Sequence, residues 1–192
     1  MSRPRSFWMR WRVRFGYPLA LVFWALAAPT LRSILVGAIV ATFGLFIRGA
    51  AAGHLRKDQE LATTGPYART RNPLYLGSAF LAAGFAVAGR SWWAGALVAA
   101  YFAIFYSAVM RNEEEDLRAR FGSAFSQYAA RVPLFFPFWL GARYEPGNAG
   151  NRQENFSWIQ YQRNREYRVL LGMIAGLVAL GLRMWVRLRL GY

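Results

Sequence analysis

The chain has 192 residues, of which 56% are hydrophobic, and a formal net charge of +15. Its length predicts a single domain over residues 1–192, and its hydrophobic fraction exceeds the roughly 45–50% usual for soluble proteins. Cysteine is absent and His54 is the one histidine, which excludes disulfides, thiolate metal sites and cysteine nucleophiles. We therefore predict no metal site, and a Ser-His-Asp triad is disfavoured.

Five stretches carry no charged side chain and are long enough to matter: 15–31, 33–47, 74–89, 91–110 and 169–182. A bilayer span needs about 17–25 residues, which 91–110 supplies alone and the others reach with flanking residues. Only Arg32 separates the first two stretches, and only Arg90 separates the next two. The pattern predicts an all-α membrane bundle of about five transmembrane helices, arranged as two tight hairpins and a C-terminal helix.

The basic residues flank these stretches, which favours a membrane surface over nucleic acid as the partner of the positive charge. With a cytoplasmic N-terminus, segments 1–14, 48–73 and 111–168 share the cytoplasmic side and hold 19 of the 24 basic residues and all nine acidic ones. The positive-inside rule supports this orientation. The arginines within 183–189 do not fit this orientation, because a fifth membrane span would place them on the side opposite the cytoplasm.

The first polar block, residues 61–77, ends in the third apolar helix. Asn72 is predicted as the N-cap of that helix, with Pro73 at its first position. A helix N-terminus attracts anions, and Arg71 beside it could bind a carboxylate with two hydrogen bonds. Two nearby aromatic rings, of Tyr67 and Tyr75, suit a cation or an adenine. A capped interfacial helix with an Arg-Tyr belt explains the same residues.

The second polar block, residues 111–133, continues the fourth helix, which is predicted to stop at Gly122. Helical spacing predicts three ion pairs, Arg111 with Glu115, Glu114 with Arg118, and Asp116 with Arg120. Glu113 instead has Val109 and Leu117 at that spacing, on the stripe that faces the bundle. A carboxylate on a packing face at the membrane boundary is a candidate site residue. An ordinary solvated charge run remains the alternative. His54 is interpreted as an interfacial helix residue.

Together the two blocks carry a resemblance. The patterns L-x-T-x-G-P-Y-x-x-x-R-N-P-x-Y-x-G and E-E-x-x-L-x-x-x-F-G-x-x-F-x-x-Y-x-x-R-V-P resemble the isoprenylcysteine carboxyl methyltransferase family and its phospholipid-methyltransferase relatives. The match covers a motif core at about 48–137, and it implies an integral membrane enzyme that uses S-adenosylmethionine. By motif position the cofactor would be lined by Thr63, Gly65, Tyr67, Arg71, Asn72, Tyr75, Gly77 and Glu114. Glu113 and Glu114 match the family's paired glutamates, and Arg131 its basic residue before Val-Pro.

Two departures weaken the assignment of a substrate. Carboxyl methyltransferases proper usually have His where this chain has Asn72, and the extension 138–192 lies outside the shared motifs. In that extension Asn164, Arg165 and Glu166 could close the pocket, although a polar interfacial lead-in to the last helix is the favoured interpretation.

The implied acceptor is amphipathic, either isoprenylcysteine-carboxylate-like or a lipid headgroup, with its tail among the membrane lipids. A carboxylate acceptor needs no base, whereas an amine must lose a proton, which Glu113 or Glu166 could accept. With Arg131 these are the predicted catalytic residues. The alternatives are a non-catalytic protein on the same scaffold and a sterol-type NADPH membrane reductase. The oligomeric state is left open.

Overall fold

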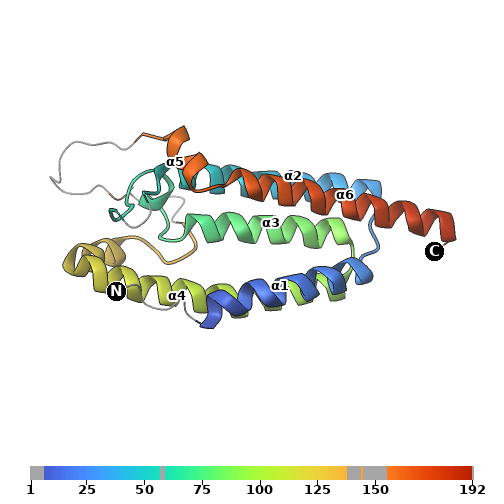
Figure 1. Ribbon diagram of the computed structural model, residues 1–192, viewed down its shortest axis with the longest axis horizontal. Helices are drawn as coiled ribbons and strands as arrows, with labels where there is room; N and C mark the ends of the chain where they lie inside the picture. Colours follow the sequence, from blue (N-terminus) through green and yellow to red (C-terminus); the bar gives the residue numbers. More distant parts are fainter. Residues whose placement is uncertain (1–6, 57–58, 138–143, 145–154, 192) are drawn as a thin grey trace. The chain divides into compact units, whose positions relative to one another are not determined.

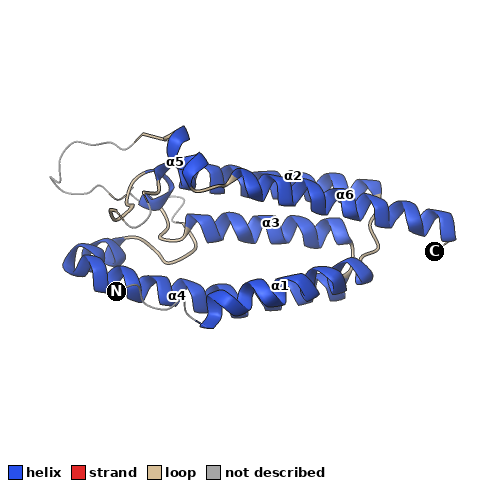
Figure 2. Ribbon diagram, viewed as in Figure 1, coloured by secondary structure: helices blue, strands red, loops and turns tan. Residues whose placement is uncertain are grey.

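The computed structural model describes residues 7–56, 59–137, 144 and 155–191. Within them all regular structure is helical (Figures 1 and 2), in the order α1 (Phe7–Leu26), α2 (Leu31–His54), η1 (Gly65–Ala68, a 3-10 helix), α3 (Pro73–Gly89), α4 (Trp92–Arg131), α5 (Trp158–Arg163) and α6 (Tyr167–Leu190). The predicted all-α class is confirmed. Of the C-terminal extension predicted from residue 138 onward, 138–143, 145–154 and 192 lie outside the described residues.

Three helices, α2, α4 and α6, are long and apolar enough to cross a membrane, and two shorter apolar helices cover Arg14–Leu26 and Pro73–Gly89. All five predicted apolar stretches are therefore helical, and three of the helices reach a spanning length by themselves. Many large apolar side chains point outward, including Ile39 (72% exposed) and Trp93 (79% exposed). Such an exposed apolar surface is what a lipid environment accommodates.

Contacts divide the chain into two compact units. Unit 1 comprises residues 1–43, 79–112 and 171–192, and unit 2 comprises residues 44–78 and 113–170. Several helices contribute to both units, because the boundaries fall inside α2, α3, α4 and α6. Both polar blocks lie almost entirely in unit 2, so this unit carries the candidate site.

In unit 1, glycine allows α2 and α3 to approach closely. A Cβ added at Gly84 would lie 2.6 Å from the backbone oxygen of Gly37 and 2.8 Å from the Cβ of Ala41. The buried apolar cluster of this unit consists of Phe23, Ala27, Ala88, Ala94 and Leu180. Small residues let helix backbones pack closely where lipid supplies no hydrophobic driving force between helices.

Arg183, which the orientation argument left unexplained, has a structural role in unit 1. Its guanidinium donates to the backbone oxygen of Ala25 at 2.9 Å and lies over the ring of Trp24, 5.0 Å from the centroid. The last carbonyls of a helix have no partner within the helix, and a basic side chain can satisfy them. Arg183 therefore donates a hydrogen bond that satisfies a carbonyl at the C-terminal end of α1.

Two local features shape the ends and the course of the long helices. Before α2, Ser33 N donates to Thr30 Oγ1 at 3.2 Å and Thr30 N donates to Ser33 Oγ at 2.9 Å, which is a reciprocal cap. At the predicted stop of the fourth helix, Gly122 has a φ of 51°, a conformation that favours glycine. The helix kinks there and then continues to Arg131, ten residues or so beyond the predicted end.

Candidate functional site

In unit 2 the two polar blocks lie together, joined by hydrogen bonds. Tyr128 Oη donates to the backbone oxygen of Tyr67 at 2.7 Å, and Arg71 N donates to that of Pro133 at 2.9 Å. The Thr70 hydroxyl adds a third bond to the segment after α4, at 2.8 Å. The backbone of the first motif is therefore held in place by α4 and by the residues that follow it.

Arg71 and Glu114 form the central ion pair, with Nη1 and Oε1 2.5 Å apart and side chains only 15% and 20% exposed. Helical spacing predicted Arg118 as the partner of Glu114, and the structure instead places Arg71 there. The contact does not have the geometry of a hydrogen bond. Among the described residues, the buried Arg71 Nε has no hydrogen-bond partner, whereas Glu114 Oε1 is in contact with Arg71 Nη1. A buried N–H without a partner costs free energy, so Arg71 Nε is the atom of this pair to which a polar ligand could bind.

Asn72 stands directly before α3, which begins at Pro73 as predicted. Its backbone oxygen accepts from Leu76 N at 2.9 Å, the first bond of the helix. Its side-chain nitrogen donates to the oxygen of Leu134 at 2.9 Å, so the amide ties the helix start to the segment after α4. Asn72 is buried, and its role is broader than that of a helix cap.

Arg48 is a residue that the sequence argument missed, except as the start of the motif match. It holds Glu166 with two parallel bonds, Nε to Oε2 at 2.9 Å and Nη2 to Oε1 at 2.7 Å. Its remaining nitrogen, Nη1, donates to Leu74 O at 3.1 Å and to Ser78 Oγ at 2.5 Å. One buried guanidinium thus connects α2, α3 and the residues just before α6. An arginine inside an apolar helix was the available signal.

Two glycines of the first motif lie where another part of the chain is too close to leave room for a Cβ. A Cβ added at Gly77 would lie 2.5 Å from Arg48 Cγ and 2.6 Å from Gly44 O, so glycine makes room for the arginine. Gly65 has a φ of +58°, and a Cβ there would lie 2.6 Å from the imidazole of His54. His54 is half-buried at the last position of α2, and its Nδ1 lies 2.8 Å from Ala50 O.

Tyr67 is buried in η1, within a cluster that includes Ala51 and Ala62. Burial and the neighbouring carboxylates of Glu113 and Glu166 raise the pKa of Tyr67 far above its ordinary value. The phenol therefore stays protonated.

The remaining predicted site residues are spread over a range of environments. Thr63 and Tyr75 are half-buried, whereas Arg131 is exposed at the last position of α4. The neighbouring Thr64 hydroxyl is buried and has no hydrogen-bond partner among the described residues. The first block therefore holds a further buried polar group without a hydrogen-bond partner among the described residues. It belongs to Thr64, the neighbour of the predicted site residue Thr63.

The residues before α6 are bound to the C-terminal end of α2. Asn164 Nδ2 donates to the backbone oxygens of Ala52 at 2.9 Å and Leu55 at 3.0 Å. Ser157 N donates to Gly53 O at 3.0 Å. These bonds satisfy carbonyls that a helix end leaves without a partner. Asn164 and Glu166 therefore hold α5 against α2, while Arg165 is exposed with a φ of 56°.

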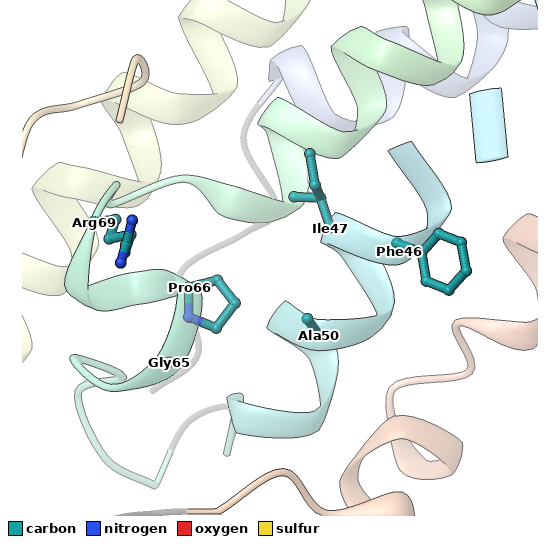
Figure 3. Close-up of a pocket in the computed structure, with 6 residues that line it drawn as sticks. All are labelled: Phe46, Ile47, Ala50, Gly65, Pro66 and Arg69. Carbon is teal, nitrogen blue, oxygen red and sulfur yellow. The ribbon is translucent and has the colours of Figure 1, made fainter. Parts of the chain in front are cut away.

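A shallow hollow of about 470 Å³ lies between the end of α2 and η1 (Figure 3), and it is lined by Phe46, Ile47, Ala50, Gly65, Pro66 and Arg69. The lining is apolar apart from Arg69, which is exposed. Three lining residues come from α2, and the ring of Phe46 points away from the short 3-10 helix. The hollow borders the first motif through Gly65, Pro66 and Arg69.

Comparison with known proteins decides the family. The sequence profile of the phospholipid methyltransferase family matches residues 20–124, which is more than half of the chain. The chain belongs to the phospholipid methyltransferase family. The match includes the whole first motif and the start of the second, so the Arg71–Glu114 pair lies inside the region that defines the family.

Two curated relatives of this family member are known by a different property. The chain is 38% identical over 108 residues to the nickel-cobalt-cadmium resistance protein NccN of Alcaligenes xylosoxydans xylosoxydans. It is 36% identical over 108 residues to the cobalt-zinc-cadmium resistance protein CzcN of Cupriavidus metallidurans. Each match covers 54% of this chain and 47% of the relative, so the aligned part is about half the length of either relative. No solved structure matches the chain.

The family implies S-adenosylmethionine as methyl donor, and the chemistry of the site fits it. The donor has a carboxylate, and Arg71 Nε is a largely buried N–H that has no hydrogen-bond partner among the described residues. The donor also has ammonium and hydroxyl groups, which the carboxylate of Glu114 could bind. By contrast, no group of three His, Cys, Asp or Glu side chains gathers within the described part of this family member.

Proposed function

We propose that the protein is an S-adenosylmethionine-dependent methyltransferase that modifies a lipophilic acceptor in the membrane. The observation that carries the proposal is the Arg71–Glu114 pair at the start of α3, where the buried Nε–H of Arg71 has no hydrogen-bond partner among the described residues. Membership of the phospholipid methyltransferase family supports it. Three helices of membrane-spanning length support a membrane-embedded acceptor.

The motif residues would bind the donor. Arg71 would bind its carboxylate through two nitrogens, assisted by the positive end of α3 after Asn72. Glu114 would hold the amino group or the ribose, and the rings of Tyr67 and Tyr75 would lie against the adenine or the sulfonium. The rest of the proposed lining is Thr63, Gly65 and Gly77. Because Gly77 lies against Arg48, its contribution is to let that arginine pass.

S-adenosylmethionine, when bound, would supply a methyl group carried on a sulfonium to the lone pair of the acceptor. The chain's own contribution is to position the two molecules and to exclude water. Tyr67 stays neutral and buried, so it adds no competing anionic nucleophile. For an amine acceptor, Glu113 would take the proton that the ammonium must lose before attack.

Glu166 and Arg131 were also predicted to be catalytic, and their surroundings favour supporting roles. Glu166 accepts two bonds from Arg48, one at each carboxylate oxygen, so the carboxylate is already engaged in holding α2. Arg131 is exposed at the end of α4, where it would attract an anionic lipid surface. We place this site on the cytoplasmic side, because the polar segments carry most of the basic residues.

The test uses purified full-length protein in lipid nanodiscs. Calorimetry should detect binding of S-adenosylmethionine, and radiolabelled methyl groups should enter extracted lipids whose methylated product is identified by mass spectrometry. Titration with NADPH serves as the control for a membrane reductase. No heat and no thermal shift with about 1 mM S-adenosylmethionine, the upper end of the usual range of enzyme KM values, would overturn the proposal. Binding without transfer would favour a non-catalytic scaffold.

A second candidate function is a part in metal resistance, favoured by the names of the two relatives. The chain has no cysteine and one histidine, a poor supply of ligands for cobalt, nickel or cadmium ions. The two candidates are compatible if methylation alters the cell envelope. Metal tolerance conferred by wild type but not by Glu113→Gln would connect them, whereas equal tolerance would separate resistance from catalysis.

A further inference from the structure

Residues 155–168 form a short stretch, the α5 segment, that contains α5 and the start of α6. We propose that the outer surface of the α5 segment is an anchor that binds the anionic headgroups of a membrane surface. Lipids bound there are neighbours of the protein and not methyl acceptors, so the anchor is separate from the proposed function.

The inner side of the α5 segment is polar and is fixed to α2 by hydrogen bonds. The side-chain nitrogen of Asn164 donates to two backbone oxygens at the C-terminal end of α2. Glu166 is buried in its ion pair with Arg48, and the backbone nitrogen of Ser157 donates to Gly53 O at 3.0 Å. These contacts define the opposite side of the segment as its outer surface.

The outer surface carries large apolar side chains. Trp158 is 69% exposed and Ile159 is 75% exposed, and the rings of Phe156 and Tyr167 are also partly open. In a water-soluble protein, large apolar side chains are usually buried and polar ones exposed. A group of exposed apolar side chains marks an interaction site for a protein or a membrane, and Trp and Tyr are enriched at membrane–water interfaces.

The same surface is positively charged. Three arginines of the α5 segment are exposed, whereas its one acidic residue, Glu166, is buried and paired with Arg48. The three are Arg163, Arg165 and Arg168. A protein partner would have to match both the apolar rings and the three charges within one short stretch. A layer of anionic headgroups offers phosphates beside a hydrocarbon boundary, so it matches both features.

The helices on either side place the α5 segment at the level of the headgroups. Both α2, which ends at His54, and α6, which begins at Tyr167, are long and apolar enough to cross a membrane. A spanning helix leaves the hydrocarbon near its ends, and Asn164 ties the residues before α6 to the end of α2. Anchoring at this level would also hold Glu166, and through it Arg48, at a fixed depth.

The first experiment measures the depth of the outer surface. The chain has no cysteine, so one introduced cysteine carries a spin label at a unique position of the full-length protein. Ile159→Cys labels the outer surface, and the control Ala119→Cys labels an exposed position among the charged residues of α4. The nanodiscs contain equal parts of phosphatidylcholine and phosphatidylglycerol.

Electron paramagnetic resonance should find the Ile159→Cys label accessible to oxygen and protected from a water-soluble nickel chelate. The Ala119→Cys label should show the opposite preference. An Ile159→Cys label that the nickel chelate reaches freely would overturn the anchor. Protection from both reagents would also overturn it, because that result indicates that another protein surface covers the segment.

The second experiment tests the headgroup charge. Native mass spectrometry compares how much phosphatidylglycerol and phosphatidylcholine each protein retains from these nanodiscs. One triple variant removes the charges of the outer surface, and a control triple variant removes three exposed arginines from residues 111–120 of α4, a stretch that also holds four acidic residues. The substitutions are Arg163→Gln, Arg165→Gln and Arg168→Gln in the first, and Arg111→Gln, Arg118→Gln and Arg120→Gln in the control.

The retained ratio of phosphatidylglycerol to phosphatidylcholine should fall about tenfold or more in the first variant, because each arginine near an anionic surface contributes about fivefold. The control should stay close to wild type, and added salt should lower the ratio of wild type. Thermal unfolding checks that both variants fold. Equal ratios in wild type and the first variant would overturn the anionic preference.

Failure of the anchor can be told apart from failure of the proposed function. Phosphatidylglycerol has neither the amine nor the carboxylate of the proposed acceptors, so its retention reports the outer surface and not the acceptor site. Both experiments are carried out without S-adenosylmethionine, and a protein that transfers no methyl group can still show the anchor. Methyl transfer by a protein whose Ile159→Cys label lies in water would leave the proposed function in place and reject the anchor alone.

Discussion

Arg48 and Glu166 are 118 residues apart in the sequence and form a bidentate ion pair, with bonds of 2.9 and 2.7 Å. Their side chains are only 16% and 10% exposed. The pair therefore fixes the turn before α6 to the middle of α2, and the same guanidinium reaches α3 through Leu74 and Ser78. A contact of this kind positions the elements around the first motif.

The first prediction concerns this pair. Glu166→Gln should lower the free energy of unfolding by about 3–5 kcal/mol, because it leaves the Arg48 charge buried and without its counterion. The double variant Arg48→Met, Glu166→Leu should recover most of that loss. Thermal unfolding in detergent measures both, with exposed Glu115→Gln as the control. If Glu166→Gln is as stable as wild type yet inactive, Glu166 is the base and not a positioning residue.

The second prediction concerns the carboxylate clamp. Arg71→Ala should weaken S-adenosylmethionine binding by about 1.5–3 kcal/mol, the usual contribution of a hydrogen bond to a charged group. Arg71→Lys keeps the charge but loses the planar fork, so it should restore only part of the affinity. Calorimetry on folded protein measures both, and Arg118→Ala, an exposed arginine on α4, is the control. An unchanged Kd in Arg71→Ala would remove Arg71 from the site.

The helices were predictable from the sequence because they depend on local patterns, and the predicted hairpins brought both polar blocks to one face of the membrane. The apolar stretches between arginines predicted the helices, and Asn72-Pro73 predicted the start of α3. The kink at Gly122 was predicted as an end, since a glycine in that conformation usually terminates a helix. Here the amphipathic segment after Gly122 buries Phe125 and Tyr128. This packing stabilises a second helical stretch.

Long-range partners were not predictable. Helical spacing assigned Arg118 to Glu114, but the buried competitor Arg71 comes from another segment. Arg48 resembled a single interfacial arginine, because its partner Glu166 lies beyond a stretch that no motif covers. Such pairs depend on tertiary contacts, which one sequence does not reveal. The assignment of individual site residues to donor and acceptor remains a prediction.

A third prediction tests the close passage of Arg48 beside α3. Gly77→Ala should destabilise the protein by about 1–3 kcal/mol, because the added Cβ would lie 2.5 Å from Arg48 Cγ and 2.6 Å from a backbone oxygen. Gly172→Ala in α6 is the matched control, since a Cβ there has no neighbour within 4 Å. It should be neutral or stabilising by up to about 1 kcal/mol through helix propensity. Equal effects in thermal unfolding would show that the passage tolerates a methyl group.

The last prediction separates the carboxylates of the acidic run. Glu113 is half-buried and lies near Tyr67, whereas Glu115, two residues further along α4, is exposed. Glu113→Gln keeps the size of the side chain and removes its charge, so it should lower kcat by about 10²–10⁴-fold if Glu113 is the general base. Glu115→Gln should leave kcat close to wild type, because exposed ion pairs contribute under about 1 kcal/mol.

The pH profile distinguishes a base from a merely structural carboxylate. For an amine acceptor, more of the free amine is present as the pH rises, so the loss of kcat in Glu113→Gln relative to wild type should shrink at high pH. Asp116→Asn, a half-buried neighbour on the same helix, is the second control and should keep the wild-type profile. If Asp116→Asn is inactive while Glu113→Gln turns over normally, the pocket lies on a different face of α4.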